Sequence, residues 1–288
     1  MLSVSAAPVR DVDPAGLLSC RILSLYERLR AQRDLAPSPL VNALFADLVN
    51  ACISADAGEV QSVLSDSRID GVRSHLIRLC AQGESLLEDA WARRALAAAD
   101  PGAEIAAFPY LDNYEQLARL ELHALAAAGH QSETARRLCF VGGGPLPLSA
   151  MLLCRTLGVH VTVVDRDREA VEVSRRLVHR LVPAERISVV LADAASPSDM
   201  ARAVAECDVV VVAALVGTTR AQKRAALRAI GTSVERGTHV VIRSADGLRS
   251  LLYPAVDISD VHNAGLVPEL LLHPLGDVVN SVLVARRR

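Results

Sequence analysis

Residues suited to binding a nucleoside follow three successive apolar runs in the second half of the chain. The run at 138–141 leads directly into Gly142, Gly143 and Gly144, after which the pattern becomes helical. Glycines let the backbone approach a ligand that a β-carbon would exclude. Asp165 ends the next run, where a carboxylate can accept both hydroxyls of a ribose, and Asp193 follows the third, within reach of an adenine amino group. Together they predict a cofactor site at the carboxyl ends of parallel strands.

The type of cofactor is indicated by the residue that closes the glycine turn. A dinucleotide-binding fingerprint, G-x-G-x-x-G, would place its third glycine at position 147, where this chain has Pro147. Proline removes N–H donors that a pyrophosphate would use at the helix N-terminus. We therefore expect S-adenosylmethionine, which has no pyrophosphate. Each signal alone has a plain structural explanation, since a glycine turn can simply connect strand to helix and an aspartate can cap the next helix.

The elements that position these residues divide the chain into two predicted domains. From about Pro14 to Gly129 the apolar residues recur at helical spacing, which predicts an all-helical domain over 1–132. Within it, Ser38 and Pro39 are expected to open a helix through 40–53, and Gly83 interrupts a helical pattern, at a cost of about 1 kcal/mol against alanine, as a sign of a site or a close contact.

From residue 137 onward, short apolar runs alternate with amphipathic segments, which predicts a Rossmann-like domain of the class I methyltransferase type over 133–288. The fold class is therefore α/β, with a mainly parallel sheet and an antiparallel edge formed by 266–272 and 278–285. The predicted strands are 138–141, 159–164, 187–191, 209–214 and 238–242, and the predicted helices are 146–157, 168–181 and 222–234.

Composition excludes several classes of protein. Hydrophobic residues make up 51% of the 288 and charged residues 22%, as in ordinary globular proteins. A net charge of −2 gives no electrostatic footprint for nucleic acid or an anionic membrane, and no signal peptide or long apolar run is evident, so we expect a cytoplasmic protein. The six scattered cysteines lack C-x-x-C spacing and the histidines lack metal-like spacing, so no metal site is predicted.

Ordered motifs along nearly the whole chain resemble the nicotianamine synthase family, which includes bacterial enzymes that make opine metallophores. The matching segments are 37–45, 79–88, 108–114, 142–148, 213–217, 243–245, 252–254 and 278–281. Three positions depart from the family. Gly143 stands where serine is common, and plant members commonly have tyrosine at the place of Leu111 and histidine at that of Asp246. The last two departures bear on the identity of the acceptor.

The resemblance implies which residues form the site. Glu84 resembles the catalytic glutamate and would take a proton from the attacking amine. Tyr110 would be the second catalytic residue, lying against Glu84 and orienting the amine or relaying the proton. Pro109, Asn113 and Tyr114 would bind the substrate. The implied cofactor-binding residues are Gly142, Gly143, Gly144, Pro145, Leu146, Asp165, Arg166, Asp193, Ala194, Ala213 and Leu215. Simpler explanations stay open, because a helical glutamate is usually solvated, and Asn113 could merely cap a helix.

The resemblance also implies a reaction. The aminobutyrate arm of S-adenosylmethionine would be transferred to the α-amine of an amino acid, most simply histidine, with release of methylthioadenosine. The product would pass to an opine dehydrogenase, and a homodimer is possible. The alternatives are nicotianamine synthesis with S-adenosylmethionine itself as acceptor, ordinary methyl transfer, and a protein that senses the cofactor without turnover. The adenosyl by-product separates the first two from methyl transfer.

Overall fold

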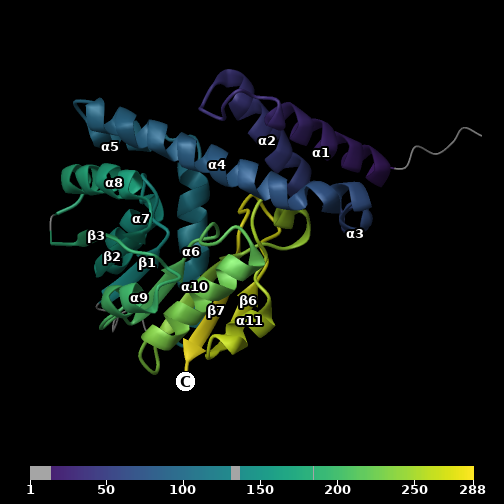
Figure 1. The fold of residues 1–288 in the computed structure, drawn as a ribbon. Coiled ribbons are helices and arrows are strands. Elements are labelled where there is room, and N and C mark those ends of the chain that lie inside the picture. Colours follow the sequence, from purple (N-terminus) through teal and green to yellow (C-terminus); the bar gives the residue numbers. More distant parts are fainter. Residues whose placement is uncertain (1–13, 131–136, 184) are drawn as a thin grey trace, which may run out of the picture.

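A computed structural model describes residues 14–130, 137–183 and 185–288. The first part of the chain is helical: α1 to α5 lie above the sheet of the second part, and α6 runs down beside the sheet (Figure 1). Its helices are α1 (Pro14–Arg30), α2 (Pro39–Ile53), α3 (Ala57–Ser65), α4 (Ser67–Ala97), α5 (Pro101–Ala106) and α6 (Leu111–Ala127). The predicted start of α2 is confirmed: Ser38 accepts a hydrogen bond from the Val41 N–H at 3.2 Å, and Pro39 fills the first turn, where no N–H is needed.

The second part forms one seven-stranded sheet with the order β3-β2-β1-β4-β5-β7-β6. Its strands are β1 (Arg137–Val141), β2 (His160–Asp165), β3 (Ile187–Leu191), β4 (Val209–Val212), β5 (His239–Ser244), β6 (Leu266–Leu272) and β7 (Ser281–Arg287). The first five strands are parallel, and β7 pairs antiparallel with both β5 and β6. Chain order reverses between β1 and β4, which is where ligands bind in open α/β sheets. The predicted fold class is confirmed.

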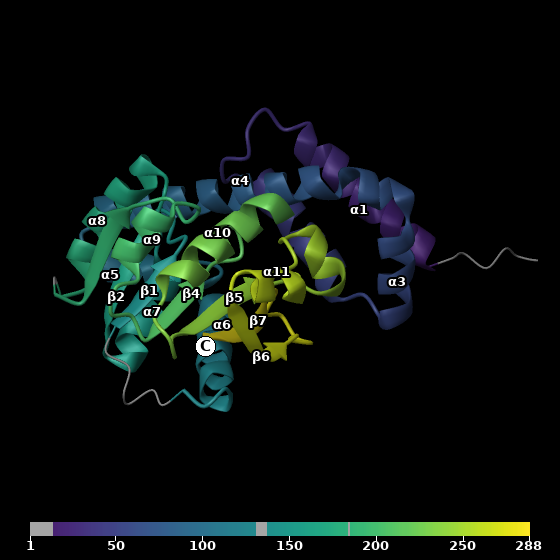
Figure 2. The ribbon, with the colours of Figure 1, turned by 60° about the horizontal axis from the view of Figure 1, so that its bottom comes forward.

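Helices cover both faces of this sheet (Figure 2). Between the strands run α7 (Leu148–Leu157), α8 (Arg168–Leu181), α9 (Pro197–Ala203), α10 (Arg220–Ser233), the 3₁₀ helix η2 (Gly247–Leu251) and α11 (Ile258–Asn263). One face packs against α6, α7 and α8, and the other against α9, α10 and α11. The strands are therefore buried on both sides, which explains their nearly continuous runs of valine and isoleucine.

Helix α4 belongs to two hydrophobic cores. Its first half, with Leu76 and Leu79, packs with α1, α2, α3 and η2. Its second half, with Ala92 and Ala95, joins the core on the face of the sheet that α6, α7 and α8 cover. The helical part is thus shared between two packing units. The predicted boundary at 132 and 133 lies outside the described residues and stays a prediction.

Gly83 lies in the uninterrupted interior of α4. A β-carbon there would collide with the aromatic ring of Phe45 on α2. Of the two explanations that the sequence left open, close packing accounts for this glycine, because the missing side chain lets α2 approach α4 directly beside Glu84.

Candidate active site

A cavity of about 390 Å³ lies between α4 and the carboxyl ends of the parallel strands. The loops after β1, β2, β3 and β4 form its lower wall, and side chains of α4 and α6 form its upper wall. All eleven residues predicted to bind the cofactor line this cavity, together with Glu84 and Tyr114. The structure therefore brings together residues that are more than 130 positions apart in the sequence.

The glycine loop after β1 is held open by its own backbone conformation. Gly142 and Gly144 have φ angles of 88° and 62°, which favour glycine. The Gly144 N–H donates to Asp165 Oδ2 at 2.8 Å, and the Asp167 N–H donates to Asp165 Oδ1 at 2.9 Å. Asp165 thus fixes the loop through both carboxylate oxygens while facing the cavity. Each oxygen keeps a further lone pair for a ligand hydroxyl.

Gly143, where the family commonly has serine, has no room for a side chain. A β-carbon at this position would collide with Val163 on β2, and one at Gly142 would meet Val216 at 2.5 Å. The Val163 side chain therefore fills the space that a side chain at Gly143 would need. This departure from the family changes the packing beneath the loop and leaves the face toward the cavity open.

The loop after β3 presents Asp193 to the same cavity. Its Oδ1 accepts a hydrogen bond from the Ala195 N–H at 2.9 Å, and its own N–H donates to Asp199 at 3.1 Å. These bonds fix the direction of the carboxylate without using all its lone pairs. Asp165 and Asp193 thus follow the neighbouring strands β2 and β3, in the arrangement expected for a ribose and its adenine.

The wall opposite the sheet carries two carboxylates, Glu84 and Glu88, one turn apart on α4. The Tyr253 hydroxyl donates to Glu84 Oε2 at 2.7 Å, and the Tyr114 hydroxyl donates to Glu88 Oε1 at 2.7 Å. Both glutamates are half-buried and line the cavity. A β-carbon at Gly144 would lie 2.7 Å from Glu88 Oε2, so this carboxylate lies against the glycine loop.

Burial and mutual repulsion set the protonation of this pair. Burial raises the pKa of Glu84, while the Tyr253 hydroxyl and the Arg243 charge act in the opposite direction. Burial, followed by repulsion from Glu84, raises the pKa of Glu88 well above its usual value. Both carboxyl groups therefore hold a proton more readily than exposed ones, and the effect is larger at Glu88. The pKa values of both tyrosines are also well above normal, chiefly through burial, so their hydroxyls remain donors.

Arg243 supplies the positive charge nearest to these carboxylates. It is 6% exposed, and its Nε and Nη2 donate to Glu121 at 2.7 and 3.2 Å, with Nη2 also donating to Ser149 at 2.9 Å. Burial lowers its pKa, but the Glu121 carboxylate outweighs this and leaves the pKa above its usual value. The guanidinium therefore stays charged inside the protein. Its ion pair connects β5 to α6 beneath the cavity.

Three residues implied by the resemblance lie outside the cavity lining. Tyr110 is 38% exposed and packs edge-on against Phe108, with ring centroids 6.0 Å apart. The expected contact between Tyr110 and Glu84 is therefore corrected: the hydroxyl on Glu84 is that of Tyr253, while Tyr110 stands at the start of α6 and packs against Phe108. The catalytic role of Tyr110 stays a prediction. Pro109 is exposed, and Asn113 donates to the Asp277 carbonyl at 2.8 Å. Their roles in substrate binding stay predictions.

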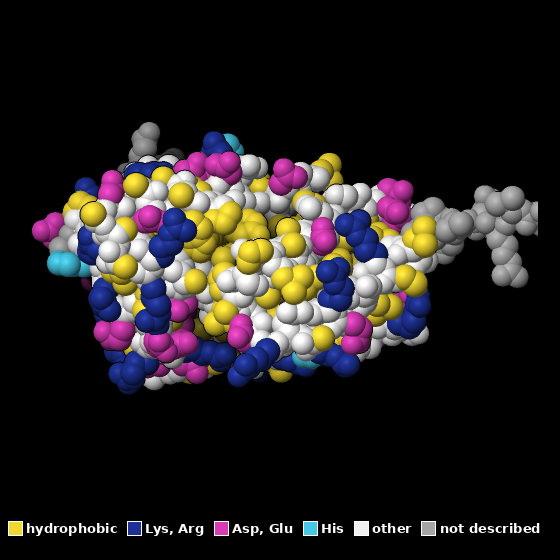
Figure 3. Space-filling model, turned by 90° about the horizontal axis from the view of Figure 1, so that it is seen from above, with side chains coloured by type: hydrophobic (Ala, Val, Ile, Leu, Met, Phe, Trp, Pro, Cys, Tyr) yellow, Lys and Arg dark blue, Asp and Glu magenta, His cyan; other side chains and the backbone are white. Residues whose placement is uncertain are grey.

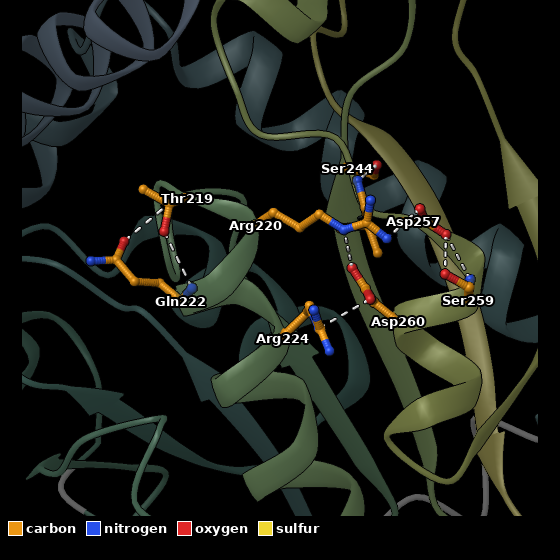
Figure 4. A network of polar contacts seen from close by, with 9 residues as sticks. Thr219, Arg220, Gln222, Arg224, Ser244, Asp257, Ser259 and Asp260 are labelled. Atoms are coloured by element: carbon orange, nitrogen blue, oxygen red, sulfur yellow. Dashed lines mark hydrogen bonds and ion pairs between the residues drawn. The ribbon is translucent and has the colours of Figure 1, made fainter.

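The loop after β4 is fixed from below by the start of α10. Buried Lys223 donates through Nζ to the carbonyls of Ala214 at 2.7 Å and Ala213 at 3.3 Å. Burial lowers the pKa of this lysine to about 7. Gln222, which lines the cavity, closes a capping box with Thr219 (Figure 4). The Lys223 amine that holds this part of the cavity wall is therefore only partly protonated near neutral pH.

The same end of α10 is attached to α11 by an ion network (Figure 4). Arg220 donates to Asp257 at 2.6 Å and to Asp260 at 2.8 Å, and Arg224 lies 3.3 Å from Asp260. Asp260 is 5% exposed, so this network is partly shielded from water. It fixes the helix that carries Gln222 and Lys223.

Sequence reasoning did not identify Glu88, Tyr253, Arg243 and Asn280, which all line the cavity. Glu88 had a usable signal, because residues four apart share a helix face with Glu84. Arg243 had another, since an arginine within a buried strand requires a partner. Tyr253 and Asn280 lie in segments that resemble the family, but nothing in their local sequence points toward Glu84.

Among the residues that the structure describes, no group of three or more His, Cys, Asp or Glu side chains could hold a metal ion. Within the same residues no single helix is long and apolar enough to cross a membrane; α2 and α3, bent by 112°, pass that test only as a pair. Seen from above, apolar side chains gather near the middle of the surface, with charged ones mostly toward the rim (Figure 3).

The fold and cavity define a Rossmann-like protein with a cavity at the carboxyl ends of its parallel strands, lined on the opposite wall by two glutamates of α4. A family model described as nicotianamine synthase protein matches residues 15–288. Nicotianamine synthase 3 of Oryza sativa subsp. indica is 37% identical over 271 residues, covering 93% of this chain and 77% of the relative. The enzyme of Solanum lycopersicum is 32% identical over 273 residues, covering 93% and 82%. The chain belongs to the nicotianamine synthase family.

Solved structures agree at the level of the fold. MtNAS in complex with MTA and tNA superposes with a TM-score of 0.77 at 23% identity, covering 98% of this chain and 100% of MtNAS. The mitomycin 7-O-methyltransferase MmcR gives a TM-score of 0.51 at 17% identity, covering 88% and 74%. The nicotianamine synthase family uses S-adenosylmethionine as a substrate, so the predicted cofactor agrees with family membership.

Proposed function

We propose that this protein transfers the aminobutyrate group of S-adenosylmethionine to the α-amine of an amino acid and releases methylthioadenosine. The observation that carries the proposal is the position of Glu84. Its carboxylate faces the same cavity as the glycine loop, Asp165 and Asp193, and it is held there by the Tyr253 hydroxyl. A base thus stands within the cavity that would hold the donor.

The proton chemistry follows from the surroundings of Glu84. An α-ammonium must lose a proton before its nitrogen lone pair can attack, and a carboxylate with a raised pKa accepts that proton more readily than an exposed one. Tyr253 occupies Oε2, which leaves Oε1 for the incoming amine. Burial raises the pKa of Glu88 beside it well above its usual value, which weakens the second negative charge that would hold the ammonium in its charged form.

The bonds in the reaction balance without a metal or redox partner. The acceptor nitrogen attacks the carbon that joins sulfur to the aminobutyrate arm, and the carbon–sulfur bond breaks with both electrons passing to sulfur. The sulfonium becomes a neutral thioether, so the leaving group needs no proton. The proton of the amine passes to Glu84. Catalysis by this chain then consists of positioning the amine and removing one proton.

The acceptor that we propose is histidine. Glu88 and Tyr114, joined by a hydrogen bond of 2.7 Å, line the cavity near Glu84 and offer a polar contact to one nitrogen of the imidazole. The product would then serve metallophore synthesis and pass to an opine dehydrogenase. A second candidate, nicotianamine synthesis with S-adenosylmethionine as acceptor, is favoured by the plant relatives.

Product analysis tests this proposal directly. Purified protein and S-adenosylmethionine are incubated with L-histidine, D-histidine or no added acceptor, and all products are identified by mass. We expect methylthioadenosine together with histidine that has gained one aminobutyrate group. Methylthioadenosine with nicotianamine and no histidine adduct would support the second candidate. S-adenosylhomocysteine as the by-product would overturn aminobutyrate transfer altogether.

Replacement of the base separates binding from chemistry. Glu84→Gln keeps the size and hydrogen-bonding reach of the side chain but accepts no proton at neutral pH. We expect nearly normal cofactor affinity and a transfer rate lower by about 10²–10⁴-fold, partly restored as the pH is raised. Wild-type turnover by Glu84→Gln would remove Glu84 from this role.

A further inference from the structure

Asn280 is a buried side chain that faces the cavity without a partner. It is 7% exposed and lines the cavity just before β7. Its Nδ2 is buried and makes no hydrogen bond within the described part of the chain. Leaving such a group unpaired costs about 1–3 kcal/mol. A ligand acceptor in the cavity would remove this cost.

Arg243 lies on the same face of the sheet as Asn280. The register pairs Arg243 on β5 with Val282 on β7, and Asn280 stands two residues before Val282. Side chains two residues apart on an extended segment share a face, and diagonal neighbours on adjacent strands lie about 7–8 Å apart. While Arg243 Nε and Nη2 are bonded to Glu121 and Ser149, Nη1 has no acceptor among the described residues.

These donors are suited to a carboxylate. An amide N–H and a guanidinium N–H can each donate to one carboxylate oxygen, and hydrogen bonds that involve charged partners are the stronger ones. The remainder of this wall carries the Glu84 carboxylate, which would repel an anion. Within the described wall around this glutamate, the Arg243 and Asn280 side therefore offers an anionic group the most favourable position.

Two carboxylates could occupy this position, that of the acceptor and that of the aminobutyrate arm of the donor. The cavity places Asp165 and Asp193 after β2 and β3, whereas Arg243 belongs to β5 and Asn280 directly precedes β7, on the other side of β1 and β4. Tyr253, which holds Glu84, lies on this second side. The amine that Glu84 deprotonates and the carboxylate near Asn280 would therefore belong to one amino acid.

We propose that Asn280 and Arg243 form a subsite for the α-carboxylate of the acceptor amino acid, with Asn280 Nδ2 donating to one oxygen and Arg243 Nη1 to the other. This inference rests on the proposed function but applies to any α-amino acid acceptor. The subsite orients the α-amine toward Glu84 and selects against amines that lack the carboxylate. Asn280 is thereby a specificity-determining residue.

The test compares acceptors with and without the carboxylate. Initial rates of methylthioadenosine release are measured for wild type and Asn280→Ala with L-histidine, histidinamide or histamine as acceptor. Histidinamide and histamine are also tested as competitive inhibitors of the reaction with L-histidine. We expect Asn280→Ala to raise the KM for histidine by about 10- to 100-fold. The KM and the inhibition constant of histamine should stay within about twofold of their wild-type values. Asn280→Asp adds a negative charge, so it should weaken the binding of histidine further and strengthen the binding of histamine.

Controls identify the group that is bound. Cofactor affinity, measured by calorimetry, should be unchanged in Asn280→Ala, and Asn263→Ala on the exposed end of α11 should behave as wild type in every assay. The ratio of the histamine constant to the KM for histidine is measured within one variant. Partial unfolding reduces the active protein equally for both compounds and therefore does not alter this ratio. An unchanged ratio overturns the subsite. A matching loss of cofactor affinity overturns the acceptor assignment and gives the subsite to the donor carboxylate.

Failure of the proposed function is recognised separately. If wild type releases no methylthioadenosine with any acceptor, aminobutyrate transfer is wrong and the inference falls with it. If methylthioadenosine forms from S-adenosylmethionine alone and histidine does not change its rate of release, aminobutyrate transfer is right and only the proposed acceptor is wrong. The subsite is then tested by the cofactor concentration that half-saturates transfer, which Asn280→Ala should raise by about 10- to 100-fold while leaving the calorimetric affinity of the donor site unchanged.

Discussion

The bond from the Tyr253 hydroxyl to Glu84 makes a quantitative prediction about pH dependence. The bond stabilises the ionised carboxylate and opposes the effect of burial on its pKa. A hydrogen bond to a charged group contributes about 1.5–3 kcal/mol, and one pH unit corresponds to about 1.36 kcal/mol. Tyr253→Phe should therefore raise the pKa of Glu84 by about one to two pH units.

The sign of the effect on rate follows from the role of the base. Glu84 acts when ionised, so the rate falls as the pH drops through its pKa. In Tyr253→Phe this fall should occur about one to two pH units higher, while the rates above it converge toward wild type. Any effect of the ionisation of the acceptor itself is common to both proteins and leaves the difference unchanged.

The assay is the rate of methylthioadenosine release, measured as kcat/KM from about pH 5 to 9. Tyr26→Phe is the matched control, since its hydroxyl is 2.8 Å from His75 Nδ1 in the helical core, outside the cavity lining. It should give the wild-type profile. A Tyr253→Phe profile that stays in place or moves to lower pH would refute the assignment of Glu84 as the base. A uniform loss at every pH would show that Tyr253 positions the substrate and has no effect on the base.

Three further predictions concern the framework of the site. Asp165→Ala should weaken cofactor binding, measured by calorimetry, by about 1.5–3 kcal/mol, because it removes the predicted ribose contact and the acceptor of the Gly144 N–H; unchanged affinity in the folded variant would contradict the site. The pKa of Lys223 is about 7 in the folded protein, whereas its ordinary value is 10.5. Between these two pH values the unfolded chain therefore binds more protons than the folded protein does. From about pH 7 to 9, the free energy of unfolding of wild type should therefore rise relative to Lys223→Met by about 1.4 kcal/mol per pH unit, measured by denaturant titration; parallel curves would contradict this. Gly83→Ala should lower the free energy of unfolding by about 1–3 kcal/mol despite the better helix propensity of alanine, because it overpacks against Phe45. Phe45→Leu in the same chain should remove part of that loss, and a stabilising Gly83→Ala would show that the helices move apart freely.

Much of the sheet and the cofactor side of the cavity could be predicted from the sequence, because each signal is local. The strand that ends at Asp165 and the glycines that follow β1 are read from a few neighbouring residues. Parallel strands then place their ends along one edge, so separate loops converge without further information. The start of α2 followed from the adjacent Ser38 and Pro39 in the same way.

The acceptor side was harder to predict because its contacts join distant segments. Tyr253 and Glu84 are 169 positions apart, and only the folded chain shows that this tyrosine, and not Tyr110, reaches the carboxylate. Asn280 gives no local signal either, since its importance comes from a missing partner and a shared face with Arg243. The family resemblance marked these segments but did not say which side chains meet.

The unbroken course of α4 also determines how small molecules enter and leave. Opening the molecule by a hinge between its two parts would pull Leu76 away from one core or Ala95 away from the other, and both are completely buried. The walls that carry Glu84 and the glycine loop therefore keep a fixed spacing. A molecule would then enter or leave past the segments at the rim of the cavity, and loop movements of that kind generally take microseconds to milliseconds. With the two walls already assembled, the proposed choice among amines would be made at the mouth and walls of the cavity, without closure around the bound substrate.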